Sequence, residues 1–381
     1  MLNYEFLCLI WSIIIGVLIT GFIITDGLDM GVGILLFIIG KNNIERRIMI
    51  NTIAPHWDGN QVWLITTGGA LFAAWPIVYA TIFSHFYIMM ILLLISLFLR
   101  PVGFEYRSKV KNKIWQKICD LCISIGSIIP PAIIGIILSN ILKGIPFYID
   151  NYYHIHSQGD FFKLFNLSSI IISFTTIVLI VNHAAAYLQI RIKDTNINNR
   201  LKKILKFSSI LLLIFFILSF INILFFMKGY KINSFIHKET NLFYEKNYHI
   251  IYKKKAWISN FQNHKYLFLI PLLSIILPFL TMLSSIYKKL LITLICSSLT
   301  IISINLSIGI IMFPFILPSN INYNQSLTIW NATSSQLTLN IMLYIVIIFM
   351  PIVLFYTFWC YKKMFFYLNK EKIKKKSDFY Y

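Results

Sequence analysis

The chain has 381 residues, of which 58% are hydrophobic and only 13% carry a charge. Soluble domains carry charged residues at about 25% of their positions, so the composition excludes an ordinary soluble protein and predicts a polytopic membrane protein. The net charge of +20 would suit nucleic acid, but the basic residues lie in loops between apolar segments, which excludes a nucleic-acid partner.

A membrane-spanning helix needs about 20 apolar residues, and nine segments of the sequence meet this requirement with no soluble domain between them. We therefore predict an all-α fold, a single transmembrane domain over residues 1–381. Its helices are predicted at about 4–39, 55–78, 80–99, 119–142, 165–188, 206–227, 266–286, 290–313 and 337–360. The first is longer than a crossing requires, so part of it must tilt or project from the bilayer.

Basic residues are concentrated on one side of the predicted membrane. Most of the 34 Lys and Arg residues lie in loops 41–54, 100–118 and 189–206, in the turn near 288 and in the C-terminal tail. Because cytoplasmic loops are enriched in Lys and Arg, the N-terminus is predicted to be periplasmic and the C-terminus cytoplasmic. Loop 228–265 is the exception, since it carries eight Lys and two Glu on the predicted outer side.

The stretch 51–76 is apolar enough to enter a membrane, yet its first half contains His56, Asp58, Asn60 and Gln61. A carboxylate in a lipid-buried segment costs roughly 2.5–3.5 kcal/mol on insertion scales, so we expect it to face a protein interior with a partner or a function. Asp58 and Gln61 are three residues apart and therefore share one helix face.

Two sets of small residues predict close helix packing. Gly27 and Gly31 form a GxxxG pattern in the first span, and Gly68 and Gly69 begin a small-residue surface in the second. Small residues let the backbones of neighbouring membrane helices approach one another, so we expect a helix to pack against each surface.

Four charged residues are predicted near the cytoplasmic face. Asp26 lies 22 residues after Tyr4, which is about 33 Å along a helix. Asp58 lies in the first turns of the second span and Arg100 lies at the end of the third. Asp29 shares a helix face with Asp26. Two interpretations stay open: a proton uptake path from the cytoplasm, or an ion-pair cluster in which Arg100 neutralises one or two aspartates and locks three helices together.

The sequence shows no convincing haem or metal site of its own. Haem iron takes axial ligands such as His, Met or Cys, and only His56, His85 and His183 lie in or beside predicted spans, no two of them at a common depth. The single Cys119-x-x-Cys122 pair has no second pair at zinc spacing. We therefore expect no metal ligands in this chain.

Aromatic residues gather near the predicted helix ends. Trp57 and Trp63 belong to this group, which fits the aromatic belt found at membrane interfaces. Contact with a quinone ring is the alternative role for these two side chains.

Six segments of this sequence form a distinctive series of motifs. They are TDGLDMGVGILL (25–36), ERRIMINTIAPHWDGNQVWLIT (45–66), GGALFAAWP (68–76), LRPVGFEYRSK (99–109), MFPFILPS (312–319) and SSQLTLN (334–340). Taken together, they resemble subunit II of bacterial cytochrome bd ubiquinol oxidases. The likeness covers the whole chain in order and is strongest over residues 20–110.

The resemblance implies a respiratory enzyme complex of the bacterial inner membrane, in which this chain is an integral subunit that is not catalytic alone. Such a complex oxidises quinol, reduces dioxygen to water and builds a proton gradient. Haem b558, haem b595 and haem d are implied in the complex, with their ligands on subunit I, the heterodimeric partner. The resemblance is also compatible with a bound quinone and with a small accessory subunit.

The resemblance also implies roles for individual residues. It assigns Asp58 as the entrance of a proton path, and Asp26, Asp29 and Arg100 also match its motif positions. We add Gln61 to the predicted path because it shares a helix face with Asp58. The resemblance also implies that the neighbourhood of Trp63 borders an oxygen path from the lipid, and Trp57 and Trp63 are the predicted oxygen or quinone contacts. Asn331 stands where the family pattern expects an acid. The competing hypotheses are a purely structural scaffold subunit and a polytopic transporter, although the paired broken helices and internal symmetry typical of transporters are not evident.

Overall fold

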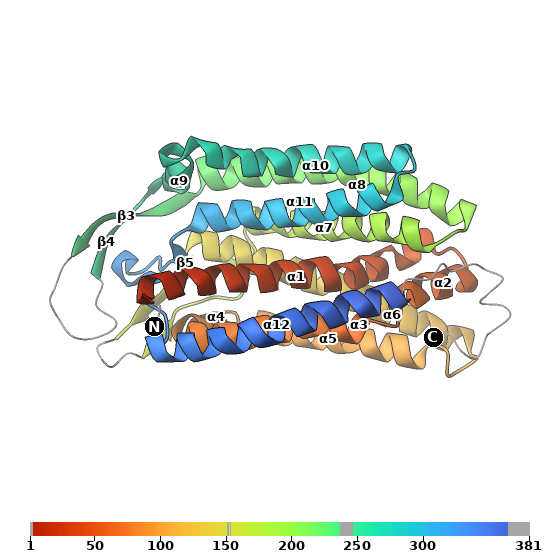
Figure 1. The fold of residues 1–381 in the computed structure, drawn as a ribbon, viewed down its shortest axis with the longest axis horizontal. Helices are drawn as coiled ribbons and strands as arrows, with labels where there is room; N and C mark the ends of the chain where they lie inside the picture. Colours follow the sequence, from red (N-terminus) through yellow and green to blue (C-terminus); the bar gives the residue numbers. More distant parts are fainter. Residues whose placement is uncertain (1–2, 151, 153, 237–246, 365–381) are drawn as a thin grey trace.

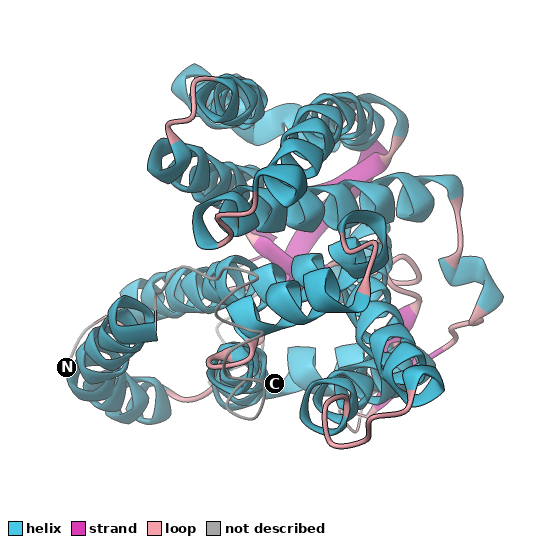
Figure 2. Cartoon of the chain, turned by 90° about the vertical axis from the view of Figure 1, so that its right-hand side faces the viewer, coloured by secondary structure: helices cyan, strands magenta, loops and turns pink. Residues whose placement is uncertain are grey.

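The structure, a computed structural model, describes residues 3–150, 152, 154–236 and 247–364. Long helices run side by side in one bundle (Figure 1), and Figure 2 shows the same helices end-on. The helices are α1 (Tyr4–Ile39), α2 (Asn43–Ile53), α3 (Trp57–Ala74), α4 (Pro76–His85), α5 (Tyr87–Tyr106), α6 (Lys113–Lys143), α7 (Leu167–Arg191), α8 (Thr195–Ile221), α9 (Ser259–Asn263), α10 (Leu269–Ile286), α11 (Leu290–Met312) and α12 (Gln336–Met364).

Three antiparallel hairpins lie at the end of the bundle where the chain begins (Figure 1). They pair β1 (Phe147–Ile149) with β2 (Ile155–Ser157), β3 (Lys228–Ile236) with β4 (Asn247–Lys254), and β5 (Phe315–Leu317) with β6 (Leu327–Thr328). Short helical turns flank them: η1 (Phe162–Leu164), η2 (Asn222–Phe226), η3 (Ala256–Ile258), η4 (Lys265–Phe268) and η5 (Tyr323–Gln325). The lysine-rich loop 228–265 is therefore largely a β-hairpin followed by a short helix.

Within the described residues, eight helical segments are long and apolar enough to cross a membrane, which agrees with the predicted polytopic all-α class. The region 55–99 differs from the prediction, because its two expected spans form three helices, α3, α4 and α5. The residue before a proline avoids the helical conformation, and Trp75 accordingly leaves it, at φ −133° and ψ 72°, so that Pro76 starts α4. α3 is not among the eight segments, and the count of nine spans stays a prediction.

Helix α1 lies against α3, α6 and α7 in the middle of the bundle (Figure 1). Its crossing with α7 is tight at Gly31, where an added Cβ would overlap the Cβ of Ala184 and lie 2.6 Å from the carbonyl oxygen of Ile180. At Gly27 the nearest contact would be an ordinary 3.7 Å. The predicted GxxxG surface therefore meets α7, and Gly31 is the residue that the close approach requires.

Replacing Gly31 by alanine is expected to destabilise the protein by about 1–3 kcal/mol, because the new methyl group forces α1 and α7 apart. Gly27→Ala is the matched control, since its methyl group meets only the flexible side chain of Ile180. Thermal unfolding of the two purified variants measures the difference. Equal unfolding temperatures for both would contradict this assignment.

The small-residue surface of α3 is open only at its start in the described chain, at Gly68 and Gly69, whereas Ala74 at its end is fully buried against other helices. An added Cβ at Gly68 or Gly69 would meet nothing within 4 Å. The same helix exposes Val62, Ile65 and Phe72, whose exposed fractions are 50%, 73% and 59%. The helix expected to pack closely here is therefore not supplied by the described part of this chain.

Candidate functional site

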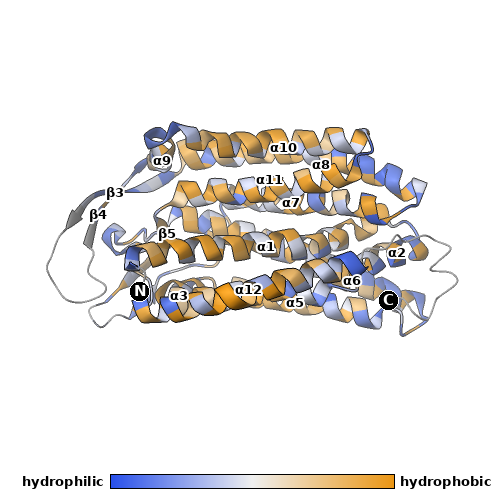
Figure 3. Cartoon of the chain, viewed as in Figure 1, coloured by the Kyte–Doolittle hydropathy of each residue, from blue (hydrophilic) through white to orange (hydrophobic). Residues whose placement is uncertain are grey.

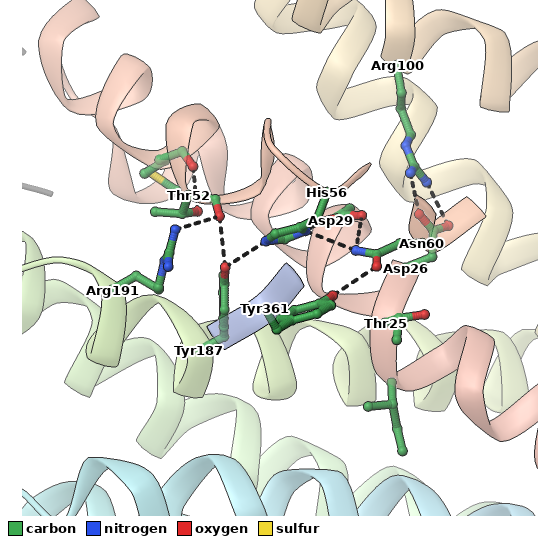
Figure 4. A network of polar contacts seen from close by, with 12 residues as sticks. Thr25, Asp26, Asp29, Thr52, His56, Asn60, Arg100, Tyr187, Arg191 and Tyr361 are labelled. Carbon is green, nitrogen blue, oxygen red and sulfur yellow. Dashed lines mark hydrogen bonds and ion pairs between the residues drawn. The ribbon is translucent and has the colours of Figure 1, made fainter. Parts of the chain in front are cut away.

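Asp26 and Arg100 form a buried ion pair between α1 and α5 (Figure 4). Both side chains have no exposed surface. Arg100 Nη1 donates to Asp26 Oδ2 over 2.9 Å, and Nη2 donates to Oδ1. A two-pronged bond of this kind satisfies both carboxylate oxygens. Asp26 is therefore neutralised in place, as the ion-pair interpretation expects of one of the aspartates.

Asp29 lies one helical turn further along α1 and is also fully buried, but no Arg or Lys among the described residues forms an ion pair with it. Its Oδ2 accepts a hydrogen bond of 2.8 Å from Asn60 Nδ2. Its Oδ1 has no hydrogen-bond partner in the described chain and lies 3.8 Å from His56 Nδ1. Buried polar atoms are normally satisfied, so this oxygen marks a place for a proton, a water or a partner group.

A chain of hydrogen bonds runs from Asp29 across to α7 (Figure 4). Asn60 Nδ2 also lies 3.1 Å from His56 Nδ1, and His56 Nε2 lies 3.1 Å from the Tyr187 hydroxyl. Tyr187 in turn donates to the Thr52 carbonyl over 2.8 Å. An amide nitrogen only donates, so His56 Nδ1 accepts and its Nε2–H donates to Tyr187. The imidazole is thereby held as one neutral tautomer between α1 and α7.

Tyr361 from α12 contacts both Asn60 and His56. Its hydroxyl donates to Asn60 Oδ1 over 2.9 Å, and its ring stacks on the His56 ring with centroids 4.7 Å apart. At the Tyr187 end of the hydrogen-bond chain, Arg191 Nη2 donates to the same Thr52 carbonyl over 3.3 Å. Side chains or backbone of α1, α2, α3, α7 and α12 thus meet in one polar cluster, at the end of the bundle that carries α2 (Figure 1).

Asp58 is not part of this cluster. Its side chain is exposed, whereas Asn60, two residues later, is 2% exposed and holds Asp29. Two residues correspond to about 200° around a helix, so the two side chains point in nearly opposite directions. Gln61 is half-buried, and its Nε2 has no hydrogen-bond partner in the described chain.

The two tryptophans of the predicted oxygen or quinone contact pack against helices of this chain. The Trp57 ring lies 5.7 Å from the Phe104 ring, centroid to centroid. Trp63 packs on α1 at Gly21, where an added Cβ would lie 2.7 Å from the indole. Both side chains are half-buried, and these contacts hold α3 against its neighbours.

Residues that matter for this cluster were missed from the sequence. His56 and Asn60 are four residues apart, as are Tyr187 and Arg191, and such spacing places each pair on one helix face. That signal identifies the two pairs as polar faces in apolar segments. Tyr361 carries no comparable signal, because only the packing of α12 brings it to His56.

Acidic side chains also pair with arginines that the sequence analysis used only for topology. Asp120 binds Arg107 at 2.6 Å and Arg46 at 3.2 Å. Glu45 binds Arg200 at 2.8 Å. Loop arginines are therefore structural links between α2, α5, α6 and α8, as well as determinants of orientation.

The histidines beside the spans do not fit a haem ligand set. His85 Nδ1 is bonded to Ser157 Oγ at 2.7 Å. His183 is bonded through both ring nitrogens, to Ser297 Oγ at 2.9 Å and to the Ile24 carbonyl at 3.1 Å. His56 is bonded to Asn60 and Tyr187 as described. An axial ligand needs a ring nitrogen aimed at the iron. Both ring nitrogens of His56 and His183 serve contacts within the chain instead, and His85 is tied to strand β2 through Nδ1.

The chain is similar to known proteins over its whole length. A family model described as cytochrome bd terminal oxidase subunit II matches residues 7–364. The chain is 45% identical over 383 residues to cytochrome bd-I ubiquinol oxidase subunit 2 of Escherichia coli strain K12, covering 100% of both chains. It is 40% identical over 382 residues to the probable cytochrome oxidase subunit 2 of Haemophilus influenzae, again covering 100% of both.

The fold is shared with a solved structure, that of bd oxidase from Geobacillus thermodenitrificans. The match has a TM-score of 0.59 at 14% identity and covers 96% of this chain and 99% of that one. Together with the length and identity of the sequence matches, it confirms the resemblance drawn from the motifs. The chain belongs to the cytochrome bd terminal oxidase subunit II family, and is thus a membrane-spanning subunit of a respiratory oxidoreductase complex.

Proposed function

We propose that this chain binds a haem-bearing subunit I in the bacterial inner membrane and conducts protons from the cytoplasm toward that partner. The complex would oxidise quinol and reduce dioxygen to water, with haem b558, haem b595 and haem d supplying the electron transfer and oxygen chemistry. We assign the haems to subunit I, since both ring nitrogens of His56 and of His183 are already bonded within this chain.

The observation that carries this proposal is the state of Asp29. Its carboxyl group is fully buried, lacks an Arg or Lys ion pair in the described chain and has one oxygen without a hydrogen bond. An acid in such a place within a membrane protein is costly to keep and is typical of proton relays. Neighbouring Asp26 is already neutralised by Arg100, which leaves Asp29 as the acid free to gain and lose a proton.

The position of Asp58 supports both parts of the proposal, the contact with subunit I and the proton path. Asp58 is exposed on α3, about three helical turns before the open surface at Gly68 and Gly69. A carboxylate on an otherwise apolar helix is costly in lipid, so a protein partner covering this face accounts for both features. We assign this face of α3 to subunit I, with Asp58 at the interface as the entrance for protons.

Replacing Asp58 by asparagine is expected to slow quinol oxidation by about fourfold, equivalent to about 0.8 kcal/mol of barrier. The effect is modest because water at the interface can carry protons around an exposed side chain. Oxygen consumption by the purified complex measures the rate, and its visible spectrum measures haem content. Asp160→Asn, an exposed acid in the loop before α7, is the matched control.

The same experiment separates a proton path from a structural scaffold. A scaffold role predicts normal turnover in the Asp58 variant, or loss of haem together with loss of the partner subunit. A proton path predicts slower turnover with haem and partner retained.

A further inference from the structure

A groove of about 470 Å³ lies between α8 and α10 and is closed at one end by η4. Its walls are almost wholly apolar, formed by Phe216 and Phe220 of α8 and by Leu272 and Ile275 of α10. Lys265 lies at its edge and is exposed. The groove therefore offers a hydrocarbon surface that ends at a positive charge.

A second hollow of about 210 Å³ lies where the hairpin meets η3 and α9. The residues that line it include Lys231, Lys253, Lys254, Lys255, Ser259 and Gln262. All four lysines are exposed. Besides Ala256 and Ile258, its lining thus offers amine, hydroxyl and amide groups, which suit an anion with several oxygen atoms.

The lysines of the hairpin are not balanced by acids in the described chain. Lys228 is paired directly opposite Lys254 in the hairpin, and like charges in that position destabilise a strand pair. Lys231 and Lys253 are diagonal neighbours on the opposite face of the hairpin. The described residues 228–236 and 247–268 contain no Asp or Glu. An external anion would relieve this repulsion.

The two hollows adjoin one another. Gln262 of the basic hollow is only three residues before Lys265 of the apolar groove. Lys255 lies over the ring of Phe225, 5.7 Å from its centroid, and Phe225 belongs to η2, which continues α8. Figure 3 shows hydrophilic residues at α9 next to the hydrophobic lengths of α8 and α10. A lysine-lined hollow therefore lies near the end of a hydrocarbon groove.

We propose that these two hollows form one binding site for an anionic phospholipid, with an acyl chain in the α8–α10 groove and the phosphate headgroup among the lysines. Lysines near a membrane surface attract anionic headgroups, each contributing a factor of about five in affinity. A neutral ligand would use the groove but not the lysine cluster. This site gives loop 228–265, the exception to the predicted charge asymmetry, a physical reason for its lysines.

The test uses the intact two-subunit complex, stripped of lipid in detergent and titrated with phosphatidylglycerol or zwitterionic phosphatidylethanolamine. Native mass spectrometry counts the bound lipids. The wild-type complex is expected to retain one phosphatidylglycerol. The triple variant Lys231→Gln, Lys254→Gln, Lys255→Gln is expected to bind it more weakly by on the order of a hundredfold. Replacing Lys202, Lys203 and Lys206 by Gln at the far end of α8 removes the same charge and should leave binding unchanged.

A second variant tests the groove without touching the lysines. Leu272→Trp fills part of it and is expected to weaken phosphatidylglycerol binding about tenfold by displacing about two methylene groups. If the lysine variant does not fold, this variant tests the lipid site by itself. The proposal is overturned if the folded lysine variant binds like wild type, if phosphatidylethanolamine binds equally well, or if a quinone occupies the groove and phosphatidylglycerol does not displace it.

Discussion

Replacing Asp29 by asparagine is expected to lower quinol oxidation by the purified complex by on the order of tenfold. An amide cannot take up and release a proton near neutral pH. Proton transfer would therefore stop at Asp29, which is buried away from water. The fold should survive, because the substituted amide keeps a carbonyl oxygen that accepts the hydrogen bond from Asn60 Nδ2. Oxygen consumption and haem content, measured on the same preparation, give the result.

Two controls make the outcome specific to Asp29. Asp160→Asn removes an exposed carboxylate from the loop before α7 and should leave turnover unchanged. Replacing Asp29 by glutamate keeps an ionisable group and should restore part of the rate, which a merely structural role does not predict. Wild-type turnover in the asparagine variant would remove Asp29 from the proton path.

Replacing Arg100 by methionine is expected to destabilise the folded protein by about 3–5 kcal/mol, because it leaves the Asp26 carboxylate buried without its partner. The two side chains are fully buried and bonded at both carboxylate oxygens, so water cannot replace the arginine. The expected result is a sharply lower unfolding temperature and a low yield of complex. Thermal unfolding of the purified complex measures it.

A double variant distinguishes charge from packing at this site. Asp26→Asn combined with Arg100→Met removes both charges and should recover much of the lost stability, since pairs in contact are strongly coupled. Lys111→Met, at an exposed loop position, controls for removal of a basic residue. If the double variant is as unstable as the Arg100 variant alone, packing of the arginine stem, and not its charge, holds α1 to α5.

Much of the architecture follows from local sequence. Long apolar segments with few charges must form helices when they enter a membrane, because lipid cannot satisfy exposed backbone groups. The predicted segments 4–39, 290–313 and 337–360 accordingly agree with α1, α11 and α12 to within a few residues. The Trp-Pro dipeptide at residues 75–76 is a local sequence signal for the helix break at Trp75. We predicted one continuous helix there because the residues around the dipeptide are apolar.

The candidate site was predicted only in part. Its acids and Arg100 stood out because charges are rare in apolar segments, and Asp26, Asp29 and Arg100 do lie buried near α2. Asp58 was also predicted as a site residue because it is a charge in an apolar segment, but its side chain is exposed. His56 and Asn60 were noted as polar residues in an apolar stretch, but together with Tyr361 they become a site around Asp29 only when their helices meet.

The sequence by itself determined the membrane class, the positions of most helices and the family, since all three depend on composition and on contiguous motifs. Tertiary structure alone decided which side of each helix points inward. The rotation of α3 about its axis turns Asn60 toward Asp29 and Asp58 away. That rotation depends on contacts between residues far apart in the chain, such as Trp63 on Gly21 and Tyr361 on His56, and local periodicity contains no information about them.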